Sequence, residues 1–77
     1  MREADCSWDA GEMGCGEVLI ELRFRMAELA AGQVFKLTTR DAGAPEEMPA
    51  WCRMTGHKLI EVEHPVYWIE KKTEHRE

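Results

Sequence analysis

The feature that most restricts the fold of this chain is a repeated change in the spacing of its apolar residues. Residues 4–10 alternate, with Cys6, Trp8 and Ala10 on one side, which predicts a short strand with one buried face. Residues 17–31 instead carry apolar side chains three or four positions apart, which predicts a helix that begins just after Cys15 and stops at Gly32. Its inner stripe is Val18, Leu19, Leu22, Met26 and Leu29.

The second half of the chain changes period in the same way. Residues 33–40 alternate and are rich in strand-forming residues. Pro45 suits the first turn of a second helix that ends at Gly56, although Pro49 leaves open a start near Glu47 or Met48. Its predicted inner stripe is Met48, Trp51, Cys52 and Thr55. Residues 57–63 and 66–71 then form two strands around a tight His64-Pro65 connection.

This order, β-α-β-α-β-β, predicts an α+β fold in two layers, a sandwich with both helices on one face of a four-stranded mixed sheet. A chain of 77 residues has room for one core only, so residues 1–77 are expected to form a single domain. We expect residues 5–71 to be ordered and the charged end of the chain, residues 71–77, to fray.

Charge and cysteine content exclude several classes of function. Compact domains with this order of elements also occur among RNA-binding proteins. The formal net charge of −5 disfavours RNA binding and suits a basic protein partner. No apolar run is long enough to cross a membrane, and the start of the chain has no secretory signal. With an odd number of cysteines, 3, these features predict a reducing cytoplasm. We also expect a monomer, an expectation that these features do not decide.

Cys15 is the candidate catalytic residue. It precedes the first predicted helix, where unpaired N–H groups stabilise a thiolate and lower the pKa of a cysteine. Gly14 and Gly16 leave its sulfur accessible, while Glu17 and Val18 complete the helix start. The alternative, that Cys15 is only a small apolar residue of the inner stripe, stays open. No catalytic base lies near it in sequence, which disfavours a Cys–His hydrolase and favours sulfur transfer.

The other two thiols are predicted to lie in the core. Cys52 is on the inner stripe of the second helix, and Cys6 alternates with Trp8. No C-x-x-C pair is present, so no metal site is predicted, and nothing in the sequence calls for a cofactor.

The chain resembles the TusA-like (SirA-like) sulfur-carrier family from about residue 5 to residue 71. The most specific stretch is Met-Pro-Ala-Trp-Cys-Arg-Met-Thr-Gly-His at residues 48–57, which is similar to the family's second helix and its exit. Asp9 precedes the cysteine by the family's distance, Asp41 follows the second predicted strand, and Cys15 falls on the family's active cysteine. Asp9 and Asp41 are therefore candidates for the rim of the site.

The resemblance implies that Cys15 receives sulfur as a persulfide from a donor protein, a cysteine desulfurase or a rhodanese-like protein. It then passes the sulfur to an acceptor protein in tRNA thiolation, cofactor assembly or sulfur oxidation. The chain departs from the family motif Cys-Pro-x-Pro, because it reads Cys-Gly-Glu-Val at residues 15–18. Gly16 loosens the turn, yet Gly16 and Val18 regain N–H groups that the prolines would lack.

Two functions from different classes follow. The first is a sulfurtransferase of the carrier type that works through Cys15. The second is a non-catalytic interaction or regulatory module on the same fold, which has lost sulfur transfer together with the two prolines.

Overall fold

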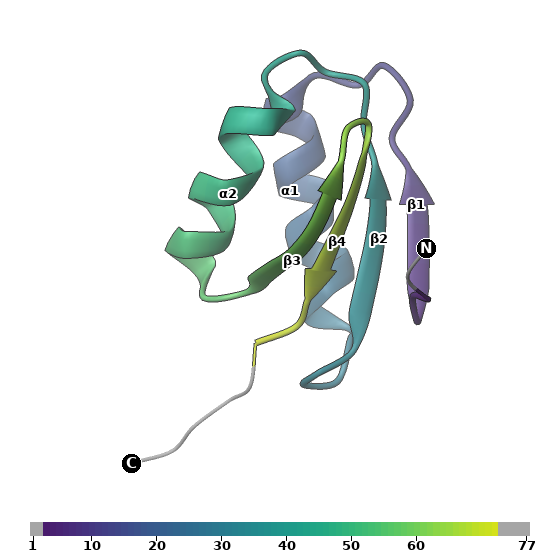
Figure 1. The fold of residues 1–77 in the computed structure, drawn as a ribbon, viewed down its shortest axis with the longest axis vertical. Helices are drawn as coiled ribbons and strands as arrows, with labels where there is room; N and C mark the ends of the chain where they lie inside the picture. Colours follow the sequence, from purple (N-terminus) through teal and green to yellow (C-terminus); the bar gives the residue numbers. More distant parts are fainter. Residues whose placement is uncertain (1–2, 73–77) are drawn as a thin grey trace.

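Residues 3–72 are described by a computed structural model, apart from the side chain of Cys15. The order of elements along the chain is the predicted one (Figure 1). The strands are β1 (Cys6–Asp9), β2 (Val34–Thr38), β3 (Lys58–Glu63) and β4 (Val66–Glu70). The helices are α1 (Cys15–Ala27) and α2 (Ala44–Thr55).

The four strands form one mixed sheet in the order β1-β2-β4-β3. β1 and β2 are parallel, and the other two pairings are antiparallel. Both helices cover the same face of the sheet, which confirms the predicted two-layer fold (Figure 1). The core lies between the layers, where Phe35 pairs with Ile69 and Leu37 pairs with Tyr67.

The inner stripes of both helices are confirmed. Val18, Leu22 and Met26 of α1 are at most 1% exposed, and Leu19 and Leu29 pack against the same core. In α2 the buried residues of the stripe are Met48, Trp51 and Cys52, whereas Thr55 is only half-buried. Burial of one apolar stripe on each helix is what joins the two layers.

The predicted end of the first helix is wrong. α1 ends at Ala27, and Gly32, with a φ of 88°, lies in the turn that follows. A distant side chain binds at this end: the Lys71 Nζ donates hydrogen bonds to the carbonyl oxygens of Met26 (2.8 Å), in the last turn of α1, and Leu29 (3.1 Å), just beyond it. The Met26 carbonyl also accepts the Leu29 N–H at 3.0 Å, so the lysine adds a cation at the negative end of the helix dipole, which favours a helix end there.

The second helix begins at its earlier predicted start. Pro45 lies in the first turn and Pro49 lies inside the helix, so the later start near Glu47 is wrong. Gly56 ends α2 in the left-handed conformation, with a φ of 90° and its N–H bonded to the Cys52 carbonyl. The same position would strain a residue with a side chain.

One tryptophan lies on the sheet face that the helices leave uncovered. Trp68 alternates with the core residues Tyr67 and Ile69, so it points to the opposite face. It is nevertheless only 4% exposed, in register between Lys36 on one side and Glu61 on the other. Trp68 therefore packs against its neighbours on this face instead of projecting into solvent.

Both helices begin at one edge of the sheet, which we call the helix-start edge (residues 9–16, 39–44 and 64–65). β1 and β2 end there, and the turn between β3 and β4 lies beside them (Figure 1). The Thr39 N–H donates to the Pro65 carbonyl across 2.8 Å and so fastens that turn to the end of β2. Within residues 3–72 no helix is long and apolar enough to span a membrane.

Candidate functional site

Cys15 is the first residue of α1 and lies on the helix-start edge. Gly14 is the N-cap, with an extended backbone (φ −64°, ψ 150°) and no capping side chain. Its carbonyl accepts the Val18 N–H at 2.9 Å. The side chain of Cys15 lies outside the part of the chain that the structure describes, so the site is built from the backbone and the neighbouring side chains.

Of the four residues predicted to support Cys15, three line an open helix start. Gly14, Gly16 and Glu17 are exposed, and a Cβ atom added at either glycine would have no neighbour within 4 Å. The N–H groups of Gly16 and Glu17 have no intrahelical acceptor, because the carbonyl four residues before each of them lies ahead of the start of the helix. They are the donors that this end of α1 offers.

Val18 does not supply the free donor that the sequence suggested. Its N–H is already bonded to the Gly14 carbonyl, and its side chain is fully buried in the core. Val18 therefore anchors the first turn of α1 against the sheet. Because Val18 stands where the family has its second proline, this position has an N–H group, but that group forms an ordinary helical hydrogen bond and is not free to bind an anion.

Asp9 organises the turn between β1 and α1. Its Oδ1 accepts the Gly11 N–H at 2.8 Å and lies 3.4 Å from the Arg40 Nη1. Gly11 has a φ of 63°, which suits glycine in a tight turn. The pair with Arg40 is well exposed, so it contributes at most about 1 kcal/mol, and it places opposite charges next to each other on this edge.

Asp41 lies in the loop from β2 to α2. Its N–H donates to the Thr39 Oγ1 at 3.4 Å, and its carbonyl accepts the Ala44 N–H at 3.0 Å. The neighbouring Arg40 N–H donates to the Gly11 carbonyl at 3.2 Å. The structure thus joins the loops that carry Asp9 and Asp41 at the edge where Cys15 begins α1.

Cys52 is the buried core thiol that the sequence predicted. It is 4% exposed, and burial raises its pKa from 9.0 to about 11. At pH 7.4 such a thiol is ionised in roughly one molecule in 4,000, whereas an ordinary cysteine of pKa about 8.5 is ionised in roughly 7%. Cys52 is therefore unsuited to sulfur chemistry.

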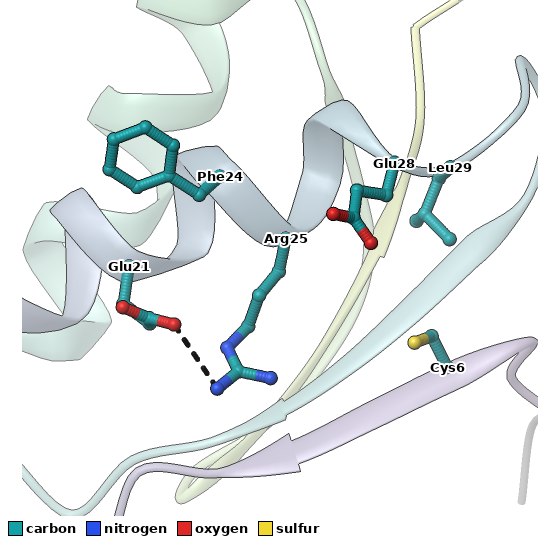
Figure 2. A pocket seen from close by; sticks show the side chains of 6 residues that line it. All are labelled: Cys6, Glu21, Phe24, Arg25, Glu28 and Leu29. Atoms are coloured by element: carbon teal, nitrogen blue, oxygen red, sulfur yellow. Dashed lines mark ion pairs between the residues drawn. The ribbon is translucent and has the colours of Figure 1, made fainter.

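The prediction that Cys6 lies in the core is wrong: it is on the side of the sheet that faces α1, beside Phe35, but it is exposed. Cys6 lies at the start of the edge strand β1, and α1 does not close over it. A groove of about 380 Å³ remains there between α1 and β1 (Figure 2). Its lining residues are Cys6, Glu21, Phe24, Arg25, Glu28 and Leu29.

Arg25 lies in this groove between Glu21 and Trp8. Its guanidinium lies 4.4 Å from the centre of the Trp8 ring and 3.1 Å from the Glu21 carboxylate. The two residues of this ion pair are four positions apart, which makes them neighbours on the helix surface. Contact with the face of an aromatic ring adds a cation–π attraction.

The Thr-Gly-His stretch at residues 55–57 serves the fold, at the end of α2 far from Cys15. The His57 Nδ1 accepts the backbone N–H of Lys72 at 3.0 Å, which places its proton on Nε2. Burial, then the charges of Lys72 and Lys71, lower the pKa of His57. The ring also contacts Trp51, with ring centres 5.5 Å apart.

No group of three or more His, Cys, Asp or Glu side chains within residues 3–72, the Cys15 side chain aside, is arranged to hold a metal ion. The described residues of the helix-start edge offer backbone donors and one ion pair.

Fold and site together define a small α+β domain with a cysteine as the first residue of its first helix. The profile of the family described as "Sulfurtransferase TusA" matches residues 8–71. The protein named "Sulfur carrier protein TusA" of Pseudomonas entomophila (strain L48) is 34% identical over 74 residues, covering 91% of this chain and 92% of the relative. The same-named protein of Pseudomonas aeruginosa (strain LESB58) is 30% identical over 77 residues, covering 95% and 98%. The chain belongs to the TusA family.

Proposed function

We propose that this chain is a sulfur carrier that accepts and relays persulfide sulfur on Cys15. The observation that carries the proposal is the position of Cys15 as the first residue of α1, beside exposed glycines and two N–H groups without intrahelical acceptors. Such donors favour the thiolate over the thiol. The relatives named as sulfur carrier proteins support the same role.

The proposed step is an exchange between sulfur atoms. The Cys15 thiolate attacks the outer sulfur of a persulfide on a donor protein. A new S–S bond forms at Cys15, the S–S bond of the donor breaks, and the donor cysteine leaves as a thiolate. No external oxidant or reductant is needed, because one S–S bond replaces another. An acceptor thiolate removes the outer sulfur from Cys15 in the same way.

The missing prolines do not exclude this chemistry. Proline fixes φ at a helix start, but α1 begins at Cys15 without one. A glycine at position 16 keeps an N–H group that a proline would lack, and the open space around it leaves room for a partner. The helix start, not the prolines, is the part of the motif that supports a persulfide.

Two kinds of partner belong to the proposal. A cysteine desulfurase or a rhodanese-like protein supplies the sulfur, and an acceptor protein in tRNA thiolation, cofactor assembly or sulfur oxidation receives it. Since Cys52 is buried with a raised pKa, the relay uses one reactive position in the helix-start edge.

Mass spectrometry tests the proposal. The protein is incubated with a desulfurase and cysteine, or with a rhodanese and thiosulfate, and each thiol is mapped. We expect a gain of about 32 Da on Cys15. Cys15→Ser should abolish the gain, and Cys6→Ser is the matched control that should keep it. A wild-type protein that gains no sulfur on Cys15 from either donor contradicts the proposal.

The second candidate is a non-catalytic interaction module on the same fold. The exposed Glu17 carboxylate in the first turn of α1 favours it, because a negative charge there competes with a thiolate for the same N–H groups. The rate of Cys15 alkylation against pH separates the two. A midpoint clearly below about 8.5 favours the carrier, and a midpoint at or above that value favours the module.

A further inference from the structure

α1 is apolar on two faces. Its inner stripe is buried, yet Ile20 and Phe24 on its outer face are 63% and 65% exposed. Figure 2 shows the Phe24 ring on the outer side of α1, whereas Arg25 and Cys6 lie between α1 and β1. Residues four apart are neighbours on a helix surface, so the two side chains form one continuous apolar row. The outer face of a surface helix is ordinarily polar, so this row calls for an explanation.

Carboxylates line one side of this row. At 100° per residue, Glu17, Glu21 and Glu28 lie within about 60° of Phe24 around the helix axis. Glu21 is paired with Arg25 at 3.1 Å, whereas Glu17 and Glu28 have no ion pair among the residues that the structure describes. Two of the three, Glu21 and Glu28, also border the groove beside β1. An apolar row with a negative border is the pattern that a basic amphipathic helix complements.

We infer that the outer face of α1, formed by Ile20, Phe24 and the three glutamates, docks a basic amphipathic helix of a partner protein. The apolar side of that helix covers Ile20 and Phe24, and its lysines or arginines meet Glu17 and Glu28. A second copy of this chain fits poorly in an antiparallel two-fold contact, because that contact would set the same glutamates against each other. A membrane also fits poorly, because its anionic headgroups would repel them.

Position along α1 connects this surface to Cys15. Ile20 lies five residues and Phe24 nine residues from the cysteine, about 7.5 and 13.5 Å along the helix axis. A protein that brings its own cysteine to Cys15 is therefore close to this surface, although at 100° per residue Cys15 lies about 180° from Phe24 around the helix axis. This connection rests on the proposed function and assigns the surface to the donor or acceptor protein, but the docking of a basic helix is measurable without any sulfur chemistry.

The probe is a fluorescent amphipathic peptide of leucine and lysine, with a leucine–glutamate peptide as its counterpart. We expect the lysine peptide to bind at least about tenfold more tightly, and to bind more weakly as salt rises from about 50 to about 300 mM. Ile20→Ser with Phe24→Ser should weaken binding at least about tenfold. Met54→Ser is the matched control, because Met54 is 78% exposed but lies on α2. It should leave binding within about twofold.

A charge variant separates the two halves of the surface. Glu17→Gln with Glu28→Gln should weaken lysine-peptide binding about threefold and flatten its salt dependence. Equal binding by the wild type and the serine double variant would overturn the inference, as would tighter binding of the glutamate peptide. Light scattering gives a further test. Self-association of the wild type that is lost in the serine double variant would also overturn the inference.

Failure of the proposed function is a separate result. It appears as a Cys15 that gains no sulfur from a desulfurase, a rhodanese or sodium polysulfide, whatever the peptide measurements give. If both proposals hold, the serine double variant slows loading of Cys15 by the donor protein that docks on α1. Loading by polysulfide, which needs no docking surface, stays at the wild-type rate in that variant.

Discussion

Ionisation of Cys52 should destabilise the protein at alkaline pH. Cys52 is 4% exposed beside Trp51, and burial raises its pKa from 9.0 to about 11. The unfolded chain therefore loses this proton first as the pH rises. The stabilisation is fully present below about pH 9 and is lost as the pH approaches 11. Two pKa units at 1.36 kcal/mol each give a loss of at most about 3 kcal/mol in the free energy of unfolding.

Urea titrations at half-unit steps from about pH 8 to 11, followed by tryptophan fluorescence, measure this loss. The reference is Cys52→Ala, which keeps every other side chain of the wild type but lacks the buried thiol. At pH 8 the variant should be less stable by about 1 kcal/mol, because it loses packed volume. The two stabilities should then converge and cross near pH 10. Stability curves that stay parallel up to pH 11 would refute a raised pKa for Cys52.

Three further predictions concern the helix ends. Gly16→Pro should keep the fold, because α2 begins with the same pattern, Ala44-Pro45, and a thermal midpoint lowered by about 10 °C or more would contradict this. Lowering the pH from 7 to 5 should destabilise the protein through His57, because the pKa of this residue is lower in the folded than in the unfolded chain. The unfolded chain therefore binds the proton first, and the contribution of His57 to the free energy of unfolding is present above about pH 6.5 and is lost below it. His57→Asn should show a smaller loss in urea titrations, and an unchanged pH slope would count against this cause. Lys71→Met should cost about 1–2 kcal/mol by removing the hydrogen bonds of the ammonium group to the Met26 carbonyl at the end of α1 and the Leu29 carbonyl beyond it, and an unchanged urea midpoint would disprove that role.

The order and faces of the elements could be predicted because they depend on local spacing. A stripe such as Val18, Leu22 and Met26 specifies which side of a helix is buried wherever that helix packs. The end of α1 could not be predicted, since it depends on Lys71, which lies 45 residues after the carbonyl of Met26. Gly32 was a reasonable prediction for the end of the helix, but Lys71 binds the carbonyl of Met26 and the helix ends at Ala27.

The position of Cys6 illustrates a second limit of the sequence. Alternation with Trp8 indicates the face of a strand but not whether another element covers it. β1 is an edge strand, and α1 passes over Trp8 through Arg25 while leaving a groove at Cys6. The exposed pair Ile20 and Phe24 had a signal, because two apolar residues four apart lie off the inner stripe. Recognising them as a surface required knowing that α2 does not cover them.

The location of the candidate site follows from connectivity more than from the motif at residues 15–18. β1 and β2 are parallel, so the helix that joins them must start where β1 ends and run back along the sheet. α2 starts where β2 ends, which is the same edge. The positive ends of both helix dipoles therefore lie on the edge where Cys15 is placed. Asp9 there is already paired with Arg40, so it adds little net negative charge. Replacing prolines with glycine and valine changes the stiffness of one turn, but it cannot move the cysteine away from this edge.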